Sequence, residues 1–363
     1  MSFSIARKGL SRFGARLRAG NGARVVAFGG GLTYDGYYLA SLARTLTRAY
    51  PGAIIETATR GLPGFGSERA VFRTRSVRDL IPDLVLVEFA IEDARSPSEG
   101  ISQAVEGIVR QLRVNDPDRE IAFVYFFTPA QIANGAIDRV MPKWESVAEY
   151  YGIPSFNGAE LADSMIAQGA VILFERWPGR RNWDERRPIA LMREDGNHTT
   201  LGGTLFGSHI AQSMITMFNP STLKTESELP PALNAGECSD AISVDVSSLG
   251  GDGWVGGPLA DSLVSKPIAA YFDRLCAADR VGAKLRISFA GRYLALWSVG
   301  SGGTMSASLD GKSVTLAPGS DDMHHEDVLL NEDQNKRHVL DLEVLRPPAV
   351  VAGLDILGKL DVP

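Results

Sequence analysis

Short apolar segments recur along the first two thirds of the chain and predict strands. Four of them are rich in β-branched and aromatic residues: RVVAF (24–28), AIIET (53–57), DLVLVEFA (83–90) and EIAFVYFF (120–127). The longest are apolar almost throughout, which is typical of strands covered on both faces. Between them, apolar residues recur every three or four positions, for example over 38–46 and 101–112, and predict helices.

This alternation predicts an α/β fold over residues 23–217. Strand–helix–strand units favour a parallel sheet with helices on both faces, here a three-layer α/β/α, flavodoxin-like arrangement. Ligands of such sheets bind at the carboxyl ends of the strands. The loops 29–35, 58–66 and 90–97 lie there, together with the later loop that leads to His198. We therefore look for chemistry in these loops.

The first 22 residues predict a helical extension of this domain. The segment is basic and has no acidic residue. We expect an amphipathic helix that packs on the domain rather than on a membrane, because its apolar face is thin. That face consists of Ile5, Leu10, Phe13 and Leu17.

The pattern changes after residue 217. Residues 218–237 are polar, contain two adjacent prolines and predict a linker. From 238 to 363, apolar and polar residues alternate with period two, and Asp310-Gly311 forms a typical hairpin turn. We predict a smaller β-rich, sandwich-like accessory domain, with strands at 241–246, 285–291, 292–299, 305–312 and 338–345.

Composition excludes several classes of function. The chain has 363 residues, and its formal net charge of −6 argues against a general nucleic-acid binder. Cys238 and Cys276 are the only cysteines, so neither a disulfide framework nor a zinc site is expected. No apolar run reaches the roughly 20 residues of a membrane helix. We expect no cofactor and no metal. The cytoplasm is the default location without a clear signal peptide; export and a homo-oligomer stay open.

Four segments resemble the sequence blocks of the SGNH, or GDSL-like, hydrolase superfamily. They are VVAFGGGLT (25–33), TRGLPGFGS (59–67), PDLVLVEFAIED (82–93) and DGNHTTLGG (195–203). The resemblance implies a three-layer α/β fold and hydrolysis of esters, often acyl groups on carbohydrates or lipids. It also implies a serine nucleophile, an Asp-X-X-His pair, and an oxyanion site made of the serine amide, a glycine amide and an asparagine.

The chain departs from this pattern at two positions. Gly31 stands where the family has the serine, and Glu92 stands where it has the asparagine. Gly64, Asp195 and His198 match the family. Loss of one oxyanion donor costs roughly 10²–10³ in rate, and a carboxylate there would repel the developing charge unless it were protonated. Both departures, at Gly31 and at Glu92, therefore disfavour ordinary serine esterase chemistry.

Three hypotheses follow for function. Glu92, Asp195 and His198 are the candidate catalytic residues. Two carboxyl groups around a sugar would suit cleavage of a glycosidic linkage, the leading hypothesis. The first alternative is a polysaccharide O-acyl (acetyl) esterase that uses an activated water or has an altered position 31. The second is a non-catalytic saccharide-binding protein. Glu92 could instead form a salt bridge with an arginine.

Candidate substrate-binding residues surround this site. Gly31, Thr33, Asp35 and Gly64 lie in the first two loops. The segment 174–195 precedes Asp195 and alternates arginine with tryptophan; tryptophan stacks on sugar rings and arginine pairs with anions. The candidates there are Trp177, Arg180, Arg181 and Trp183. They favour an anionic saccharide, unless these arginines only pair with the acidic residues of the loop.

Other polar residues receive structural interpretations. Glu88 lies inside a strand and needs a partner, for which Arg60 or Arg73 is our guess, while Asp93 supports its loop. The histidines of DDMHHED (321–327) are expected in an exposed loop. Trp254 is a candidate sugar contact of the accessory domain, and Trp297 is expected in its core.

Overall fold

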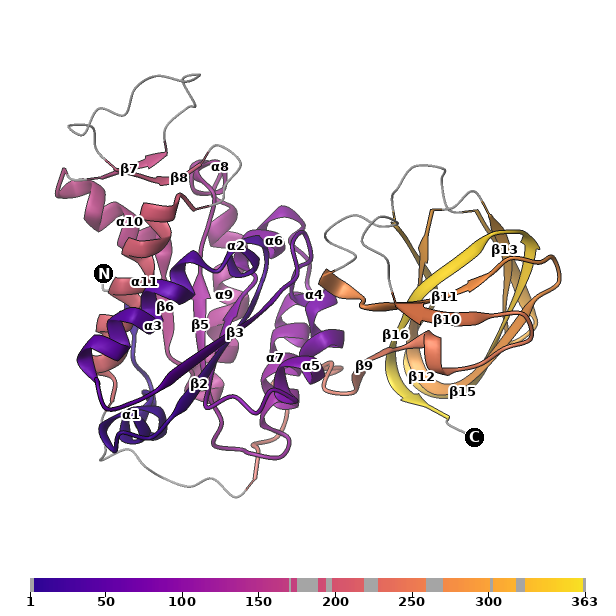
Figure 1. The fold of residues 1–363 in the computed structure, drawn as a ribbon, viewed down its shortest axis with the longest axis horizontal. Helices are drawn as coiled ribbons and strands as arrows, with labels where there is room; N and C mark the ends of the chain where they lie inside the picture. Colours follow the sequence, from indigo (N-terminus) through magenta and orange to yellow (C-terminus); the bar gives the residue numbers. More distant parts are fainter. Residues whose placement is uncertain are drawn as a thin grey trace. The chain divides into compact units, whose positions relative to one another are not determined.

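The computed structural model divides into two compact units (Figure 1). Unit 1 consists of Met1–Ala70 and Thr74–Glu237, and unit 2 consists of Val71–Arg73 and Cys238–Pro363. Three residues from within the predicted α/β domain thus belong to unit 2. The structure describes residues 3–169, 171–174, 189–193, 198–218, 228–258, 270–300, 303–317 and 324–361.

Unit 1 is built on a sheet of six strands, five of them parallel. The order across the parallel part is β3 (Ile55–Gly61), β2 (Ala23–Gly29), β4 (Leu84–Glu88), β5 (Glu120–Tyr125) and β6 (Ser155–Asn157). Numbered along the chain this order is 2-1-3-4-5, the flavodoxin-like arrangement, which confirms the predicted fold class. The short strand β1 (Ser4–Ile5) pairs antiparallel with β6. A separate parallel pair consists of β7 (Val171–Phe174) and β8 (Ile189–Met192).

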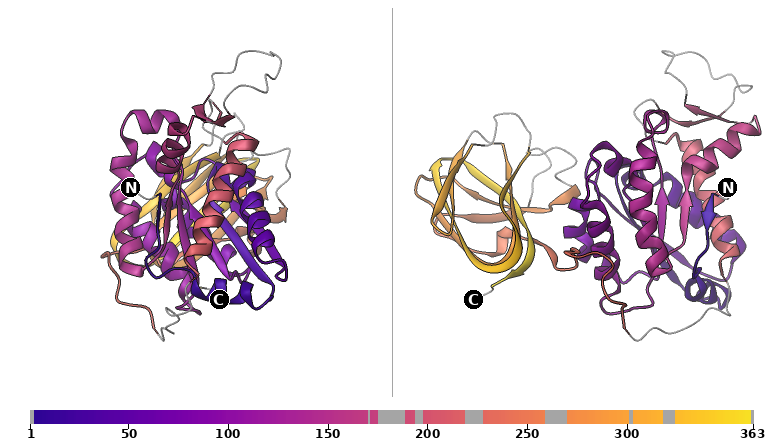
Figure 2. Two further views of the ribbon diagram at one scale, coloured as in Figure 1. Left: turned by 90° about the vertical axis from the view of Figure 1, so that its left-hand side faces the viewer. Right: turned by 180° about the vertical axis from the view of Figure 1, so that it is seen from behind.

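Helices cover both faces of this sheet (Figure 2). One face packs against α1 (Ser11–Arg18), α3 (Tyr37–Ala49), α10 (Gly158–Ala167) and α11 (Thr200–Thr216). The other layer contains α4 (Ser67–Ala70), α5 (Thr74–Arg78), α6 (Ala90–Arg95), α7 (Ile101–Arg113) and α9 (Ala136–Tyr151). Two short helices follow strands at the carboxyl edge: α2 (Gly31–Asp35) after β2 and α8 (Pro129–Ala133) after β5.

The strands are apolar on both faces because each face has its own helical layer. In β2, Val25 and Ala27 join the core beneath α3 and α11. Val26 and Phe28 point the other way, since successive side chains alternate across a strand, and the Phe28 ring meets the Phe89 ring edge-on at 4.9 Å. This burial explains why the central strands could be read from the sequence.

The N-terminal segment packs on unit 1 in a different form from the one expected. Phe13 and Leu17 are buried on α1, and Leu10 is buried just before it. Ile5 was wrongly placed on this helix: it lies in β1 and is about half exposed. Pairing with the edge of β6 is what takes the chain out of helical geometry there.

The second half of the predicted linker is bound to unit 1. The buried Glu106 carboxylate accepts the backbone N–H groups of Leu233 and Asn234 at 2.6 and 2.7 Å. Arg110 donates to the carbonyl oxygen of Pro230 at 2.9 Å. Residues 228–237 therefore follow the surface of α7, while 219–227 lie outside the described residues.

Unit 2 is an antiparallel β domain, in agreement with the predicted class. Its sheet contains β9 (Ala241–Val244), β10 (Val255–Pro258), β11 (Arg274–Ala278), β12 (Lys284–Val299), β13 (Thr304–Leu309), β14 (Lys312–Leu316), β15 (His324–Arg346) and β16 (Ala349–Leu360). The two strands predicted over 285–299 form one strand, β12, which has an irregularity between Gly291 and Tyr293. Asp310 and Gly311 form the two-residue turn between β13 and β14, both with positive φ.

Two predictions for polar and aromatic residues of unit 2 have clear outcomes. Trp297 is in the core, where its indole N–H donates to buried Asp355 at 2.8 Å. The exposed loop expected at 321–327 is wrong for its second part, because β15 begins at His324 and pairs His325 with Ser298. Trp254 is only 6% exposed, which leaves little of its ring for a sugar.

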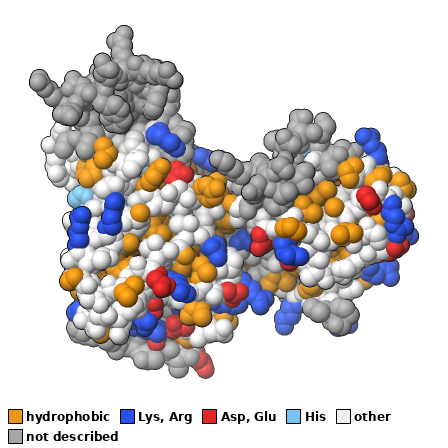
Figure 3. Space-filling view, in the orientation of Figure 1, with side chains coloured by type: hydrophobic (Ala, Val, Ile, Leu, Met, Phe, Trp, Pro, Cys, Tyr) orange, Lys and Arg blue, Asp and Glu red, His pale blue; other side chains and the backbone are white. Residues whose placement is uncertain are grey.

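Two further observations bear on partners. Within the described ranges, no helix is long and apolar enough to cross a bilayer, and no three His, Cys, Asp or Glu side chains gather as a metal site. Among the residues coloured in Figure 3, Lys and Arg are interspersed with Asp and Glu on the visible face. This face therefore does not present the surface of one sign that favours nucleic acid.

Candidate functional site

Three loops meet where the strand order of unit 1 reverses, between β2 and β4. The backbone N–H of Gly30, after β2, donates to the carbonyl oxygen of Glu88 at 2.9 Å. The N–H of Leu62, after β3, donates to the carbonyl oxygen of Gly29 at 2.7 Å. The loops after β2, β3 and β4 are thus held together at the position where doubly wound sheets bind ligands.

Glu92 reaches back from α6 to the turn after β2. Its Oε1 accepts the backbone N–H of Gly31 at 3.1 Å, and its side chain is buried. Its Oε2 is also buried and has no hydrogen-bond partner among the described residues. Burial raises the pKa of Glu92 to about 7, although the Gly31 N–H lowers it in part. Both protonation states of Glu92 are therefore populated at neutral pH.

Glycine leaves room for this carboxyl group. A Cβ added to Gly30 would lie 2.2 Å from the carboxyl carbon and both carboxyl oxygens of Glu92. In the second loop, Gly64 has a φ of +83°, a backbone conformation that residues with side chains rarely adopt. The space beside its Cα is open. The glycines of these loops thus make room for Glu92 and set the path of the chain.

A second buried carboxyl group, that of Glu88, lies at the end of β4. Its Oε2 accepts the Thr33 hydroxyl at 3.1 Å, and that hydroxyl lies 2.9 Å from the Tyr38 hydroxyl. Our guess of Arg60 or Arg73 as its partner was wrong: a hydroxyl pair from α2 and α3 holds it instead. Burial, and then the charge of Glu92, raise the pKa of Glu88 well above its usual value. The Glu88 carboxyl group accordingly holds its proton more tightly than an exposed carboxyl group does.

Asp93 has the geometry of a structural residue. Its Oδ1 accepts the N–H of Ser67 at 2.7 Å, and its Oδ2 accepts the indole N–H of Trp144 at 2.9 Å. A Cβ on Gly66 would lie 2.4 Å from the same Oδ1. Asp93 thus fastens the loop after Gly64 to α6 and α9, while its neighbour Glu92 points to the turn at Gly31.

His198 lies between aromatic rings on the α11 side of the sheet. Its backbone bridges to Met192, its ring stacks on Phe206 at 4.7 Å, and the Phe126 ring meets it edge-on at 4.5 Å. Burial lowers the pKa of His198 to about 3, so the imidazole is neutral. Its Nε2 is buried and has no hydrogen-bond partner in the described part of the chain.

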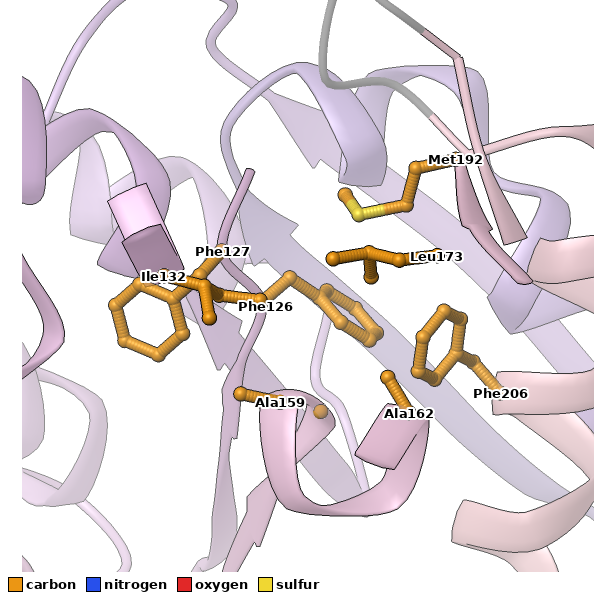
Figure 4. Close-up of a pocket in the computed structure, with 9 residues that line it drawn as sticks. Phe126, Phe127, Ile132, Ala159, Ala162, Leu173, Met192 and Phe206 are labelled. Carbon is orange, nitrogen blue, oxygen red and sulfur yellow. The ribbon is translucent and has the colours of Figure 1, made fainter. Parts of the chain in front are cut away.

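A small apolar cavity is lined by Phe126 and Phe206, the two rings that contact His198 (Figure 4). Its volume is about 10 Å³, close to the minimum for one water molecule. In Figure 4 the side chains of Phe126, Leu173, Met192 and Phe206 surround it. An apolar space of this size does not admit a sugar ring.

The expected meeting of Glu92 and His198 stays a prediction. Among the described residues there is no hydrogen bond or ion pair between them, since Glu92 binds Gly31 and His198 packs against Phe126 and Phe206. The alternative of an Arg salt bridge to Glu92 is not seen in these ranges either. Asp195 lies outside the described residues, so a possible link to His198 stays a prediction.

The predicted substrate-binding residues divide into three groups. Thr33 is fully buried and its hydroxyl bonds to Glu88, which is a structural contact. Asp35 lies at the carboxyl edge, with one carboxylate oxygen 3.9 Å from the Arg193 guanidinium. Trp177, Arg180, Arg181 and Trp183 lie outside the described residues.

Sequence reasoning missed the aromatic surroundings of His198 and the hydroxyl pair at Glu88. Tyr38 was assigned only to a helical face, and Phe126 only to a strand, yet their rings lie 5.4 Å apart beside the site. The one available signal was position, because Phe126 directly follows the last residue of β5 at the carboxyl edge.

Comparison with known proteins supports the fold. No family model and no curated protein sequence matches the chain. A two-domain esterase (CEX) active on acetylated mannans, co-crystallised with mannopentaose, is similar at a TM-score of 0.70 and 17% identity, covering 98% of this chain and 97% of that chain. A second crystal structure of a two-domain esterase active on acetylated mannans gives 0.69 and 18%, covering 98% and 99%.

Such identities establish fold alone. The similarity spans both units. The chain shares its two-domain fold with an esterase active on acetylated mannans.

Proposed function

We propose that this protein hydrolyses O-acyl esters on a carbohydrate, with water as the attacking group and Glu92 as the general base. The observation that carries this proposal is the hydrogen bond from the Gly31 N–H to Glu92 Oε1 at 3.1 Å. It fixes a carboxyl group with a pKa of about 7 beside the position where the resembling family has its serine. A base whose pKa lies near the working pH is the most effective one.

The two oxygens of Glu92 take different roles in this mechanism. Oε1 is anchored by Gly31, so Oε2, which lacks a partner among the described residues, is the oxygen that accepts a proton from water. The hydroxide that forms attacks the ester carbonyl carbon. The bond from that carbon to the sugar oxygen then breaks, and Glu92 returns the proton to the sugar oxygen. Water is consumed, and a carboxylic acid and a free sugar hydroxyl are released.

The remaining groups support this step. The resemblance assigns the Gly64 N–H to the oxyanion that develops on the carbonyl oxygen. Glu88 lies four residues before Glu92, at the end of β4, and ionisation of one disfavours ionisation of the other. This coupling supports a single mobile proton in the site, as in carboxyl pairs of other hydrolases.

A second candidate function is saccharide binding without turnover. The observation that favours it is the burial of both Glu92 Oε2 and His198 Nε2, neither of which has a hydrogen-bond partner among the described residues. A site closed in this way would keep the fold of an esterase without its chemistry.

Acetate release separates the two candidates. The protein is incubated with acetylated mannan, acetylated xylan and p-nitrophenyl acetate, and both acetate and new reducing ends are measured. The proposal predicts acetate without reducing ends. Reducing ends without acetate would overturn it in favour of glycosidic cleavage.

The double variant Gly31→Ser/Glu92→Asn tests the second candidate. It restores both residues of the resembling family. If the unaltered protein releases no acetate while this variant does, the esterase proposal is wrong and binding without turnover is favoured.

A further inference from the structure

A groove of about 550 Å³ lies within unit 2, in the region of β13, β14 and β15. Its volume is in the range of small-molecule sites, roughly 300–1,000 Å³. β14 ends the strand order of the sheet, so one wall of the groove is an edge strand. Val314 of this strand lines the groove and is about half exposed. The groove is thus open to solvent along a strand that has one neighbour in the described sheet.

An imidazole–carboxylate pair forms part of the groove wall. His338 Nδ1 lies 2.7 Å from Asp310 Oδ2, and the His338 side chain is only 4% exposed. The bond to His338 and the Val339 N–H lower the pKa of Asp310. An ionised carboxylate can only accept, so Nδ1 carries a proton and Nε2 is left as the second polar atom of the ring.

The second ring nitrogen of His338 is unused within the described part of the protein. Its Nε2 is buried and has no hydrogen-bond partner among the described residues. A buried polar atom without a partner costs free energy of about 1–3 kcal/mol. A hydroxyl group can donate or accept, so a hydroxyl-bearing ligand or a bridging water suits this nitrogen in either protonation state.

The lining also restricts the class of ligand. Leu309, Leu316 and Leu330 offer apolar surface, while Asn331 offers an amide. Three carboxylates, those of Asp310, Asp327 and Glu332, line the groove with one lysine, Lys312, and Glu332 also pairs with Lys336 at 2.9 Å. Apolar surface beside acceptors suits a molecule with apolar faces and many hydroxyls, and the excess of carboxylates repels anions.

We propose that this groove binds an uncharged, hydroxyl-rich ligand the size of one or two sugar rings. The site is separate from the one at Gly31 and does not depend on the function proposed there. It gives unit 2 a ligand site of its own.

Binding to the full chain tests this proposal by titration calorimetry. The probes are neutral disaccharides (mannobiose, cellobiose, lactose and maltose) and the anionic digalacturonate. Val314→Trp fills the groove from an exposed position, and Thr315→Trp is its matched control, because the adjacent Thr315 does not line the groove. Asp310→Asn weakens the acceptor that holds the Nδ1 proton.

At least one neutral disaccharide is expected to bind saturably, and digalacturonate is not. Val314→Trp should reduce affinity at least 10-fold, Asp310→Asn several-fold, and Thr315→Trp less than 2-fold. Circular dichroism shows whether each variant is folded. If Asp310→Asn does not fold, Val314→Trp still tests the proposal, because Val314 lies at the surface. Absence of saturable binding, equal affinity in Val314→Trp, or preference for digalacturonate would overturn the proposal. Loss of binding in Glu92→Gln but not in Val314→Trp would place the ligand at Gly31 instead, and would leave the proposed function standing.

Discussion

The backbone N–H of Gly31 donates to Oε1 of Glu92 at 3.1 Å. This bond joins the turn after β2 to the helix after β4, across the point where the strand order reverses. It also couples the two positions at which the chain departs from the resembling hydrolase family. Gly31 has no side chain where the resemblance implies a serine, and Glu92, where it implies an asparagine, accepts the Gly31 N–H. The two departures therefore form one structural unit.

Replacement of Glu92 by glutamine should reduce the pH dependence of stability. The folded carboxyl group has a pKa of about 7 against 4.5 for the ordinary value, so the folded state binds the proton more tightly. The resulting stability is complete below about pH 4.5 and is lost as the pH rises through 7. Urea unfolding at pH 5.5 and 8.0 measures it.

Between pH 5.5 and 8.0, the free energy of unfolding of the wild type should fall by on the order of 2 kcal/mol more than that of Glu92→Gln. The amide of glutamine still accepts the Gly31 N–H, so the fold is kept. Titrating groups that do not interact with Glu92 cancel in the comparison, whereas the coupled Glu88 contributes to the difference. An identical pH dependence in the two proteins would show that Glu92 is not held in this environment.

His198 should stay neutral across the physiological pH range. Burial between Phe126 and Phe206 lowers its pKa to about 3 from 6.5, so its stabilising effect is present above pH 6.5 and declines as the pH falls toward 3. Imidazole NMR signals recorded from pH 5 to 8 measure this, with His198→Phe as the assignment control. A midpoint between pH 6 and 7 for the His198 signal contradicts the buried geometry.

Alanine at Gly30 should destabilise unit 1 through Glu92. The added Cβ would lie 2.2 Å from the carboxyl atoms of Glu92, and overpacking of this kind costs about 1–3 kcal/mol. Chemical unfolding of Gly30→Ala, Glu92→Ala and the double variant forms a cycle that isolates their interaction.

The loss of unfolding free energy caused by Gly30→Ala should largely disappear when Glu92 is also replaced by alanine. Gly22→Ala is the matched control, since a Cβ at Gly22 makes only an ordinary contact, 3.7 Å from the Ile54 carbonyl oxygen. If Gly30→Ala were equally costly with and without the Glu92 side chain, the close approach would have another cause.

Trp144→Phe should lower stability without changing the chemistry at Glu92. It removes the indole donor to Asp93 Oδ2 and leaves a buried carboxyl oxygen without that partner, at about 1–3 kcal/mol. Urea unfolding and the activity per folded molecule are compared with those of Trp297→Phe, which removes the same kind of bond to Asp355 in unit 2. A large loss of activity at unchanged stability would make Asp93 more than a support for its loop.

The sequence was most informative where burial is complete. The strands predicted at 24–28 and 120–127 agree with β2 and β5, because central strands covered on both faces are apolar throughout. The strand predicted at 53–57 was displaced: β3 runs from Ile55 to Gly61. β3 lies at the sheet edge, carries polar residues and has no continuous apolar signal.

The site was predictable only in part, for a different physical reason. Loop order placed Gly31 and Glu92 at the same sheet edge, and their hydrogen bond agrees with that placement. Which side chains surround a buried group depends on helix packing, which a linear pattern does not encode. The partner of Glu88 and the aromatic rings around His198 therefore emerged only in three dimensions.

The pH profile of kcat/KM for acetate release, measured for the wild type and for Glu92→Gln, tests the central claim most directly. If Glu92 is the base that activates water, wild-type activity rises with a single ionisation near pH 7, and Glu92→Gln is at least about 100-fold slower with no such rise. Equal activity and the same profile in both proteins would contradict the account.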